Sequence, residues 1–97
     1  MGSNSVYRNF IDMAADQGLA VAMYMMGHRY RDGDGVRRDC YQALQWFRMA
    51  ADYGYALGLN DMAWIHVSVP EFRNPEAALV LAKQCVRAQI SVGGGLA

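Results

Sequence analysis

Few residues of this chain could carry chemistry, and their spacing groups none of them into a familiar reactive set. His28 and His66 are far apart, and no cysteine or carboxylate is spaced to complete a metal site with either. Cys40 and Cys85 fall near the start of one predicted helix and near the end of another, so we expect reduced thiols rather than a disulfide. The residues therefore predict neither a metal nor a cofactor.

Asp32-Gly33-Asp34-Gly35 is the stretch that most resembles a ligand loop. A twelve-residue calcium loop starting at Asp32 would need a chelating glutamate at the position of Ala43. The alternative is a structural turn, in which Gly33 and Gly35 supply positive φ angles. We expect the turn.

A nucleophile beside an acid or base is not visible in the sequence either. There is no Ser-His-Asp or Cys-His grouping and no phosphate-cradling glycine loop, and Glu71 and Glu76 are the only glutamates. The sequence thus predicts a protein that is not an enzyme.

Composition narrows the class of partner. The 97 residues have a formal net charge of zero and a pI near 6.7, whereas nucleic acid or an acidic membrane would call for a basic excess. No apolar run approaches the roughly 20 residues that cross a bilayer, and no basic-then-apolar leader opens the chain. We expect a cytoplasmic protein whose partners are proteins or peptides.

The elements that position these residues repeat along the chain. Met49-Ala50-Ala51-Asp52 follows Met13-Ala14-Ala15-Asp16 by 36 residues, and Trp46-Phe47 follows Phe10-Ile11 by the same interval. A fixed period of this length with helical patterning indicates a helical solenoid, in which each helix pair buries its apolar face against its neighbours.

Two motifs carry a family resemblance. The run from Met26-Gly27 through Gly33-x-Gly35-Val36 to Trp46-Phe47-x-x-Ala50-Ala51-x-x-Gly54 resembles the Sel-one-like repeat, a relative of the tetratricopeptide repeat. A second copy begins at Asn60 and departs from the pattern, because Ser68 to Arg73 replaces the glycine loop. The resemblance implies an all-α fold, a right-handed α-α superhelix of about five antiparallel helices.

The pattern predicts one domain over residues 1–97. Gly18, Gly54 and Pro70 are the expected breaks, and Asp39 and Asn74 the expected caps of helices to about Tyr53 and Ser91. The expected parts are an N-terminal capping helix at 5–17, a first repeat at 20–54, a variant repeat at 56–91 and a flexible tail at 92–97.

Helical spacing also predicts the core. The helix over 20–31 is expected to bury Ala22, Met23, Met26, Gly27 and Tyr30, with Gly27 at a close helix crossing. On the next helix Trp46 and Phe47 are expected to interdigitate with alanines, and Trp46→Ala to cost about 3 to 5 kcal/mol.

The first helix of each repeat, expected over 20–31 and 56–67, has a second face opposite the core. This face supplies the functional prediction, a scaffold that binds a peptide or partner helix. In tetratricopeptide proteins these positions line the concave groove, so the resemblance points them at a ligand. Arg31 is expected to hold a carboxylate of the ligand, and binding to strengthen toward pH 6 through His28. The predicted groove residues are Val21, Tyr24, His28, Arg31, Leu57, Asn60, Trp64 and Val67.

A structural or self-assembling module, or a fragment of a longer array, is the alternative function. The last helix would have no further helix to cover Leu79, Leu81, Val86 and Ile90. Self-association through this C-terminal helix would bury that surface and give a homo-oligomer.

Overall fold

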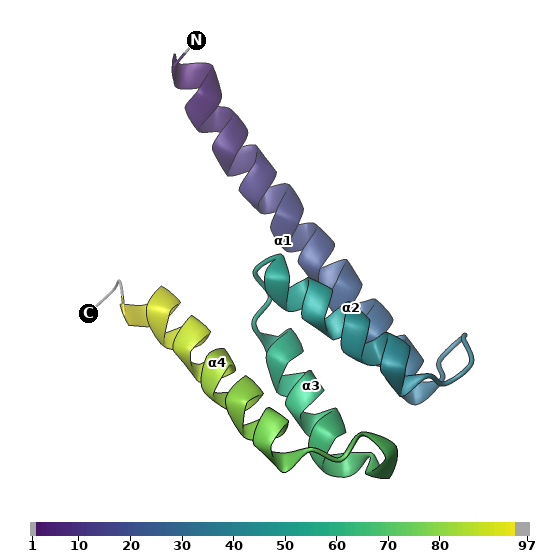
Figure 1. The fold of residues 1–97 in the computed structure, drawn as a ribbon. Helices are drawn as coiled ribbons and strands as arrows, with labels where there is room; N and C mark the ends of the chain where they lie inside the picture. Colours follow the sequence, from purple (N-terminus) through teal and green to yellow (C-terminus); the bar gives the residue numbers. More distant parts are fainter. Residues whose placement is uncertain (1, 95–97) are drawn as a thin grey trace.

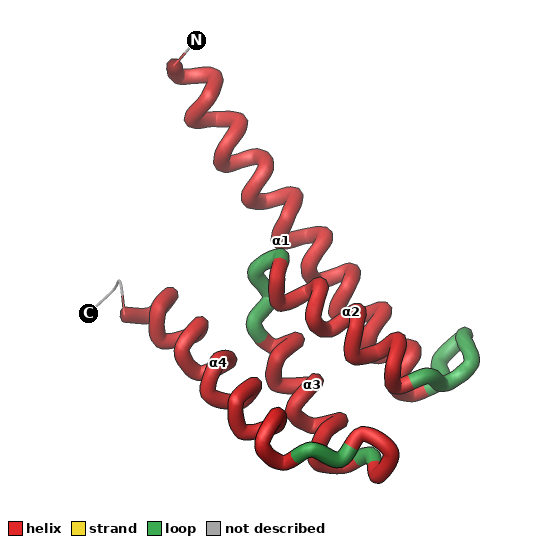
Figure 2. Tube along the Cα trace, in the orientation of Figure 1, coloured by secondary structure: helices red, strands yellow, loops and turns green. Residues whose placement is uncertain are grey.

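The protein is all-helical along the backbone that the computed structural model describes, residues 2–94; side chains are described for residues 17–89. The elements are α1 (Gly2–Asp32), α2 (Cys40–Asp52), α3 (Leu57–Ser68), a 3-10 helix η1 (Pro70–Phe72) and α4 (Pro75–Gly94). Each α-helix packs mainly against its neighbours in the chain (Figures 1 and 2). The predicted α-solenoid is therefore confirmed, with four α-helices in place of five.

The missing helix boundary is at Gly18. The sequence predicted that a capping helix over 5–17 ends there, but α1 runs through Gly18 without a break. Gly18 is not among the glycines with positive φ. The N-terminal half of α1, purple in Figure 1, extends past α2 and away from the other helices. The chain is correspondingly elongated, with extents of 53 × 34 × 15 Å.

The turns on either side of α2 form as their residues predict. Gly33 and Gly35 have φ angles of 72° and 74°, which allow the sharp reversal after α1. Asp39 caps α2, because its carboxylate accepts a hydrogen bond from the Gln42 amide at 3.1 Å. After α2 the chain turns at Gly54, where φ is 105°.

The core is organised around Phe47, whose side chain is fully buried. A Cβ on Gly27 of α1 would lie only 2.5 Å from its ring, which confirms the predicted close crossing at Gly27. A Cβ on Gly58 of α3 would overlap its backbone carbonyl. Trp46 is only half-buried, so the expectation that it anchors the core is wrong. Successive residues on a helix point about 100° apart, and of this pair it is Phe47 whose ring meets α1 and whose carbonyl meets α3.

The second repeat closes through a different loop. Pro70 starts the short helix η1, and the Phe72 carbonyl lies 2.8 Å from Nδ1 of His66. The His66 carbonyl accepts a hydrogen bond from the Asn74 amide, and the Asn74 side chain caps α4 by accepting one from Ala77 at 3.1 Å. His66 thus holds the loop that replaces the glycine turn, and Asn74 is confirmed as a cap.

Helix α4 covers α3 with one face only. Leu81 and Cys85 are buried in the core, so Leu81 does not belong to the exposed surface that the sequence predicted for this helix. Leu79, Val80 and Val86 are exposed. The side chain of Ile90 lies outside the described residues, and α4 continues through Gly94 into the stretch expected to be a tail. Cys40 and Cys85 are both free and buried.

Candidate partner-binding face

The face of α1 that meets the other helices is rotated from the predicted one. Met23 and Gly27 are buried as expected, but Ala22 is exposed. Tyr24, expected on the open face, is half-buried against the core cluster instead. The reason is that Tyr24 packs against Phe47 of α2 and Tyr55 of the turn that follows it.

Aromatic rings connect α1 to the turn after α2. The Tyr24 ring lies 4.5 Å from His28, 4.8 Å from Tyr55 and 5.5 Å from Phe47, measured between centroids. His28 stands edge-on to Phe47 at 5.3 Å. Such edge-to-face pairs add to the energy of apolar burial and fix the ring orientations. Two predicted groove residues, Tyr24 and His28, therefore serve first to join the helices.

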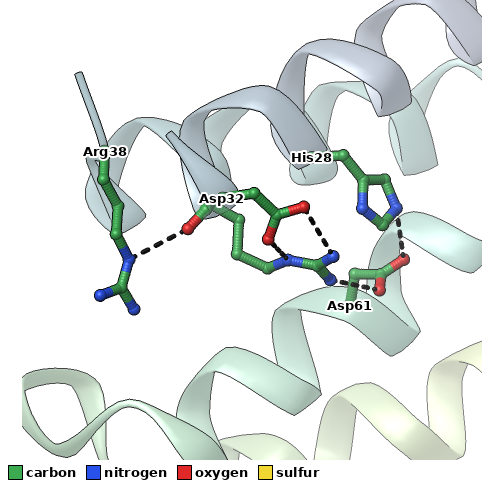
Figure 3. Close-up of polar contacts among 5 residues, drawn as sticks. His28, Asp32, Arg38 and Asp61 are labelled. Carbon is green, nitrogen blue, oxygen red and sulfur yellow. Dashed lines mark hydrogen bonds and ion pairs between the residues drawn. The ribbon is translucent and has the colours of Figure 1, made fainter. Parts of the chain in front are cut away.

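A buried carboxylate lies beneath these rings. Asp61 of α3 accepts a hydrogen bond from Nη1 of Arg31 at 3.3 Å, and its Oδ2 lies 3.8 Å from Nε2 of His28 (Figure 3). That Oδ2 atom is buried and has no hydrogen-bond partner among the described residues. We call Tyr24, His28, Arg31 and Asp61 the Asp61 cluster. It is the polar link between α1 and α3.

Arg31 is occupied by carboxylates of its own chain. Its Nε and Nη2 donate to the two carboxylate oxygens of Asp32 at 3.0 and 3.3 Å, while Nη1 donates to Asp61. The guanidinium also lies over the ring of Trp64, 5.1 Å from the centroid, at cation–π distance. A ligand carboxylate would have to displace one of these partners, so the binding role expected for Arg31 stays a prediction.

Burial and neighbouring charges shift the pKa values of Tyr24 and Arg31 in the Asp61 cluster and of Asp32 beside it. Burial raises the pKa of the Tyr24 phenol well above its usual range, and the nearby Asp61 carboxylate raises it further. The hydrogen bond from Arg31 lowers the pKa of Asp32, and the same bond raises the pKa of Arg31. Tyr24 and Arg31 thus keep their protons at neutral pH, and Asp32 is ionised.

These shifts predict a small pH-dependent contribution from Asp32. Because its pKa is lowered in the folded protein, ionised Asp32 stabilises the fold above about pH 4, and this is lost as the pH falls through the lowered pKa. Asp32→Asn should reduce the free energy of unfolding at neutral pH by less than about 1 kcal/mol, since the pair is exposed.

Urea unfolding of parent and Asp32→Asn near neutral pH and at about pH 2 measures the effect. The two proteins should differ at neutral pH and converge in acid. Asp34→Asn is the control, because Asp34 makes no ion pair among the described residues. An equal effect of both substitutions would show that the Arg31 pair contributes nothing specific.

A groove lies between α3 and α4, next to the Asp61 cluster. Its volume is about 460 Å³ and its wall is mostly apolar. We call it the α3–α4 groove. The residues that line it are Asn60, Ala63, Trp64, Val67, Pro75, Ala78, Leu79 and Ala82.

The eight predicted groove residues therefore divide into three sets. Asn60, Trp64 and Val67 line the α3–α4 groove, and Arg31 reaches its edge through the contact with Trp64. Tyr24 and His28 belong with Arg31 to the Asp61 cluster. Val21 and Leu57 are exposed apolar side chains in neither group.

Asp61 is the residue that reasoning from the sequence missed. Its signal is a carboxylate between buried positions of a helix, since Leu59 and Met62 on either side are core residues. A buried carboxylate needs a cationic or hydrogen-bonding partner. Arg31 on α1 is the cation that pairs with Asp61.

Comparison with models of known protein families gives a match to the first repeat. The family model described as the Sel1 repeat matches residues 20–55, which span the second half of α1, the glycine turn and α2. No curated protein and no solved structure matches the chain. None of the described helices combines the length and hydrophobicity of a membrane-spanning helix.

Proposed function

Because residues 20–55 are a Sel1 repeat, and Sel1 repeats are generally protein-interaction modules of a non-enzymatic type, we propose that this protein is a scaffold that binds a peptide or partner helix in the α3–α4 groove. The single observation that carries the proposal is Trp64. Trp64 stays 49% exposed at the wall of a mostly apolar groove. Exposed tryptophans in apolar grooves are frequent anchors of protein interfaces.

The chemistry of the groove favours an apolar ligand. Val67, Leu79 and the alanines give a wall on which an amphipathic helix or an extended peptide could lay apolar side chains. Asn60 is the polar group able to hydrogen-bond a backbone. Arg31, already paired with Asp32 and Asp61, orients the Trp64 ring instead of capturing an acidic group.

Binding should depend on Trp64 more than on other exposed aromatic residues. Peptides selected from a displayed library against the parent protein should bind Trp64→Ala at least about tenfold more weakly, a typical loss at an aromatic hot spot. Tyr41→Ala is the matched control, because Tyr41 is 59% exposed but lies on α2, outside the groove. Titration calorimetry measures both affinities, and circular dichroism checks that helicity is unchanged.

Two results would contradict the proposal. Selected peptides that bind Trp64→Ala like the parent would place the interaction elsewhere on the surface. Peptides that prefer acidic residues and lose affinity in Arg31→Ala alone would restore the carboxylate-binding role of Arg31.

A structural, self-assembling module is the second candidate. The observation in its favour is the exposed apolar face of α4, formed by Leu79, Val80 and Val86. Association through this face would also cover one wall of the α3–α4 groove, since Leu79 belongs to both. The mass of a variant at Val86, described below, tests this candidate.

A further inference from the structure

The internal repeat shows which helix should cover the open side of α1. Where the two repeats meet, α2 packs on α3, and backbone atoms of Phe47 and Ala51 lie against Gly58. Thirty-six residues earlier in the sequence, the same positions are Ile11, Ala15 and Ala22. The stretch over 5–17 therefore corresponds to α2, and the second half of α1 corresponds to α3.

That covering helix is absent from its place in the described structure. Gly58 and Asp61 are buried on α3, whereas their counterparts Ala22 and Met25 are exposed on α1. Leu19, one turn earlier, is exposed as well. An apolar strip is thus open at the position where the repeat geometry calls for a packed helix.

Residues 5–17 cannot pack on this strip of their own helix while α1 is straight. With a rise of 1.5 Å per residue, positions 11 and 22 lie about 16 Å apart along one helix axis. Two copies of α1 side by side and antiparallel would instead bring position 11 of each opposite position 22 of the other. Their two-fold axis would then pass midway between positions 11 and 22, about 2 Å along the helix from Gly18.

Gly18 has no close contact among the described residues that would require a glycine. Glycine weakens a helix interior, and the other interior glycines of the packed region, Gly27 and Gly58, are required by close contacts with Phe47. A Cβ on Gly18 would meet no described atom within 4 Å. A close crossing of two α1 helices at this point would give Gly18 the role that Gly27 and Gly58 have.

We infer that the protein forms an antiparallel homodimer through α1, in which residues 5–17 of each copy cover the Leu19–Ala22–Met25 strip of the other. The exchanged segment occupies the place that a capping helix of the same chain would take. The dimer face is distinct from the α3–α4 groove and from the exposed side of α4.

Sedimentation of the full chain tests the dimer. The parent should have twice the monomer mass of 10.8 kDa. Met25→Lys should raise the dimer Kd by about tenfold or more, because it places a charge in the apolar contact. Val86→Lys is the matched control, since Met25 is 55% and Val86 53% exposed, and it should dimerise like the parent.

Three results of this experiment would overturn the inference. They are a parent of 10.8 kDa at every concentration, a Met25→Lys variant that dimerises like the parent, and a dimer that dissociates in Val86→Lys instead. The last would assign self-association to α4.

A pair of introduced cysteines distinguishes two arrangements of residues 5–17. They pack either on the other copy or, if α1 bends at Gly18, on their own chain. In a variant with Ile11→Cys and Ala22→Cys, mild oxidation should give a covalent dimer on a non-reducing gel. Each single substitution is the control for the native thiols of Cys40 and Cys85, which are buried. A disulfide within one chain would show that α1 bends at Gly18 and would overturn the exchange.

Discussion

Phe47→Ala should lower the free energy of unfolding by about 3 to 5 kcal/mol, the usual cost of truncating a large aromatic side chain in a core. Phe47 is fully buried, and its ring meets α1 at Gly27, Tyr24 and His28. Its loss would leave a cavity at the centre of the first repeat. The glycine at 27 offers no side chain to fill that cavity.

Urea unfolding followed by circular dichroism measures this loss at a fixed protein concentration. Trp46→Ala is the control on the same helix, and it should cost clearly less because Trp46 is half-buried. If Trp46→Ala is the more damaging of the two, the core lies on the other side of α2 from the one described above.

Gly58→Ala should destabilise the protein by about 1 to 3 kcal/mol, although alanine is the better helix former. Its methyl group would overlap the Phe47 carbonyl and lie 3.3 Å from the Ala51 amide nitrogen. Both atoms belong to the backbone of α2 and cannot rotate away. Helices α2 and α3 would have to separate.

Gly27→Ala makes a useful comparison because its methyl group would strike the Phe47 ring rather than backbone. Phe47→Leu should make room for it, so Gly27→Ala and Phe47→Leu should couple favourably in a double-mutant cycle. Gly58→Ala with Phe47→Leu should show no such relief, because the carbonyl stays in place. Equal coupling in both cycles would contradict the contact geometry assigned to Gly58.

Local signals in the sequence were enough to predict the turns and caps. Asp39, Asn74 and the glycines at 33, 35 and 54 act through their own backbone or through an amide three residues away. Such interactions depend on few other residues. The order and ends of α2, α3 and α4 were therefore predictable to within a few residues.

Features that depend on long-range packing were not predictable in the same way. Glycine stops a helix only if the chain gains by turning there, and α1 runs through Gly18 without a break. Trp46 and Phe47 have the same local pattern, and the rotation of α2 between two neighbours decides which is buried. The sequence predicted that α2 is a helix with an apolar side, but not which of its aromatic residues faces the core.

The candidate site shows the same division. Asn60, Trp64 and Val67 were predicted from the repeat register, and they line a groove with α4, whereas the prediction placed them in one groove with α1 residues. The ion pairs of Arg31 were not predicted, because they depend on Asp32 next to it and on Asp61 thirty residues away. A charged residue on a predicted binding face has to be checked for partners within its own chain.

The packing of each helix on its sequence neighbour also has a kinetic consequence. Contacts between residues close in the chain form after the closure of short loops, so this topology favours rapid folding. The α1–α2 hairpin can assemble before α3 has left the ribosome. Until α3 arrives, the Phe47 carbonyl side of α2 remains open to water, and the two repeats are joined only when Gly58 docks against it.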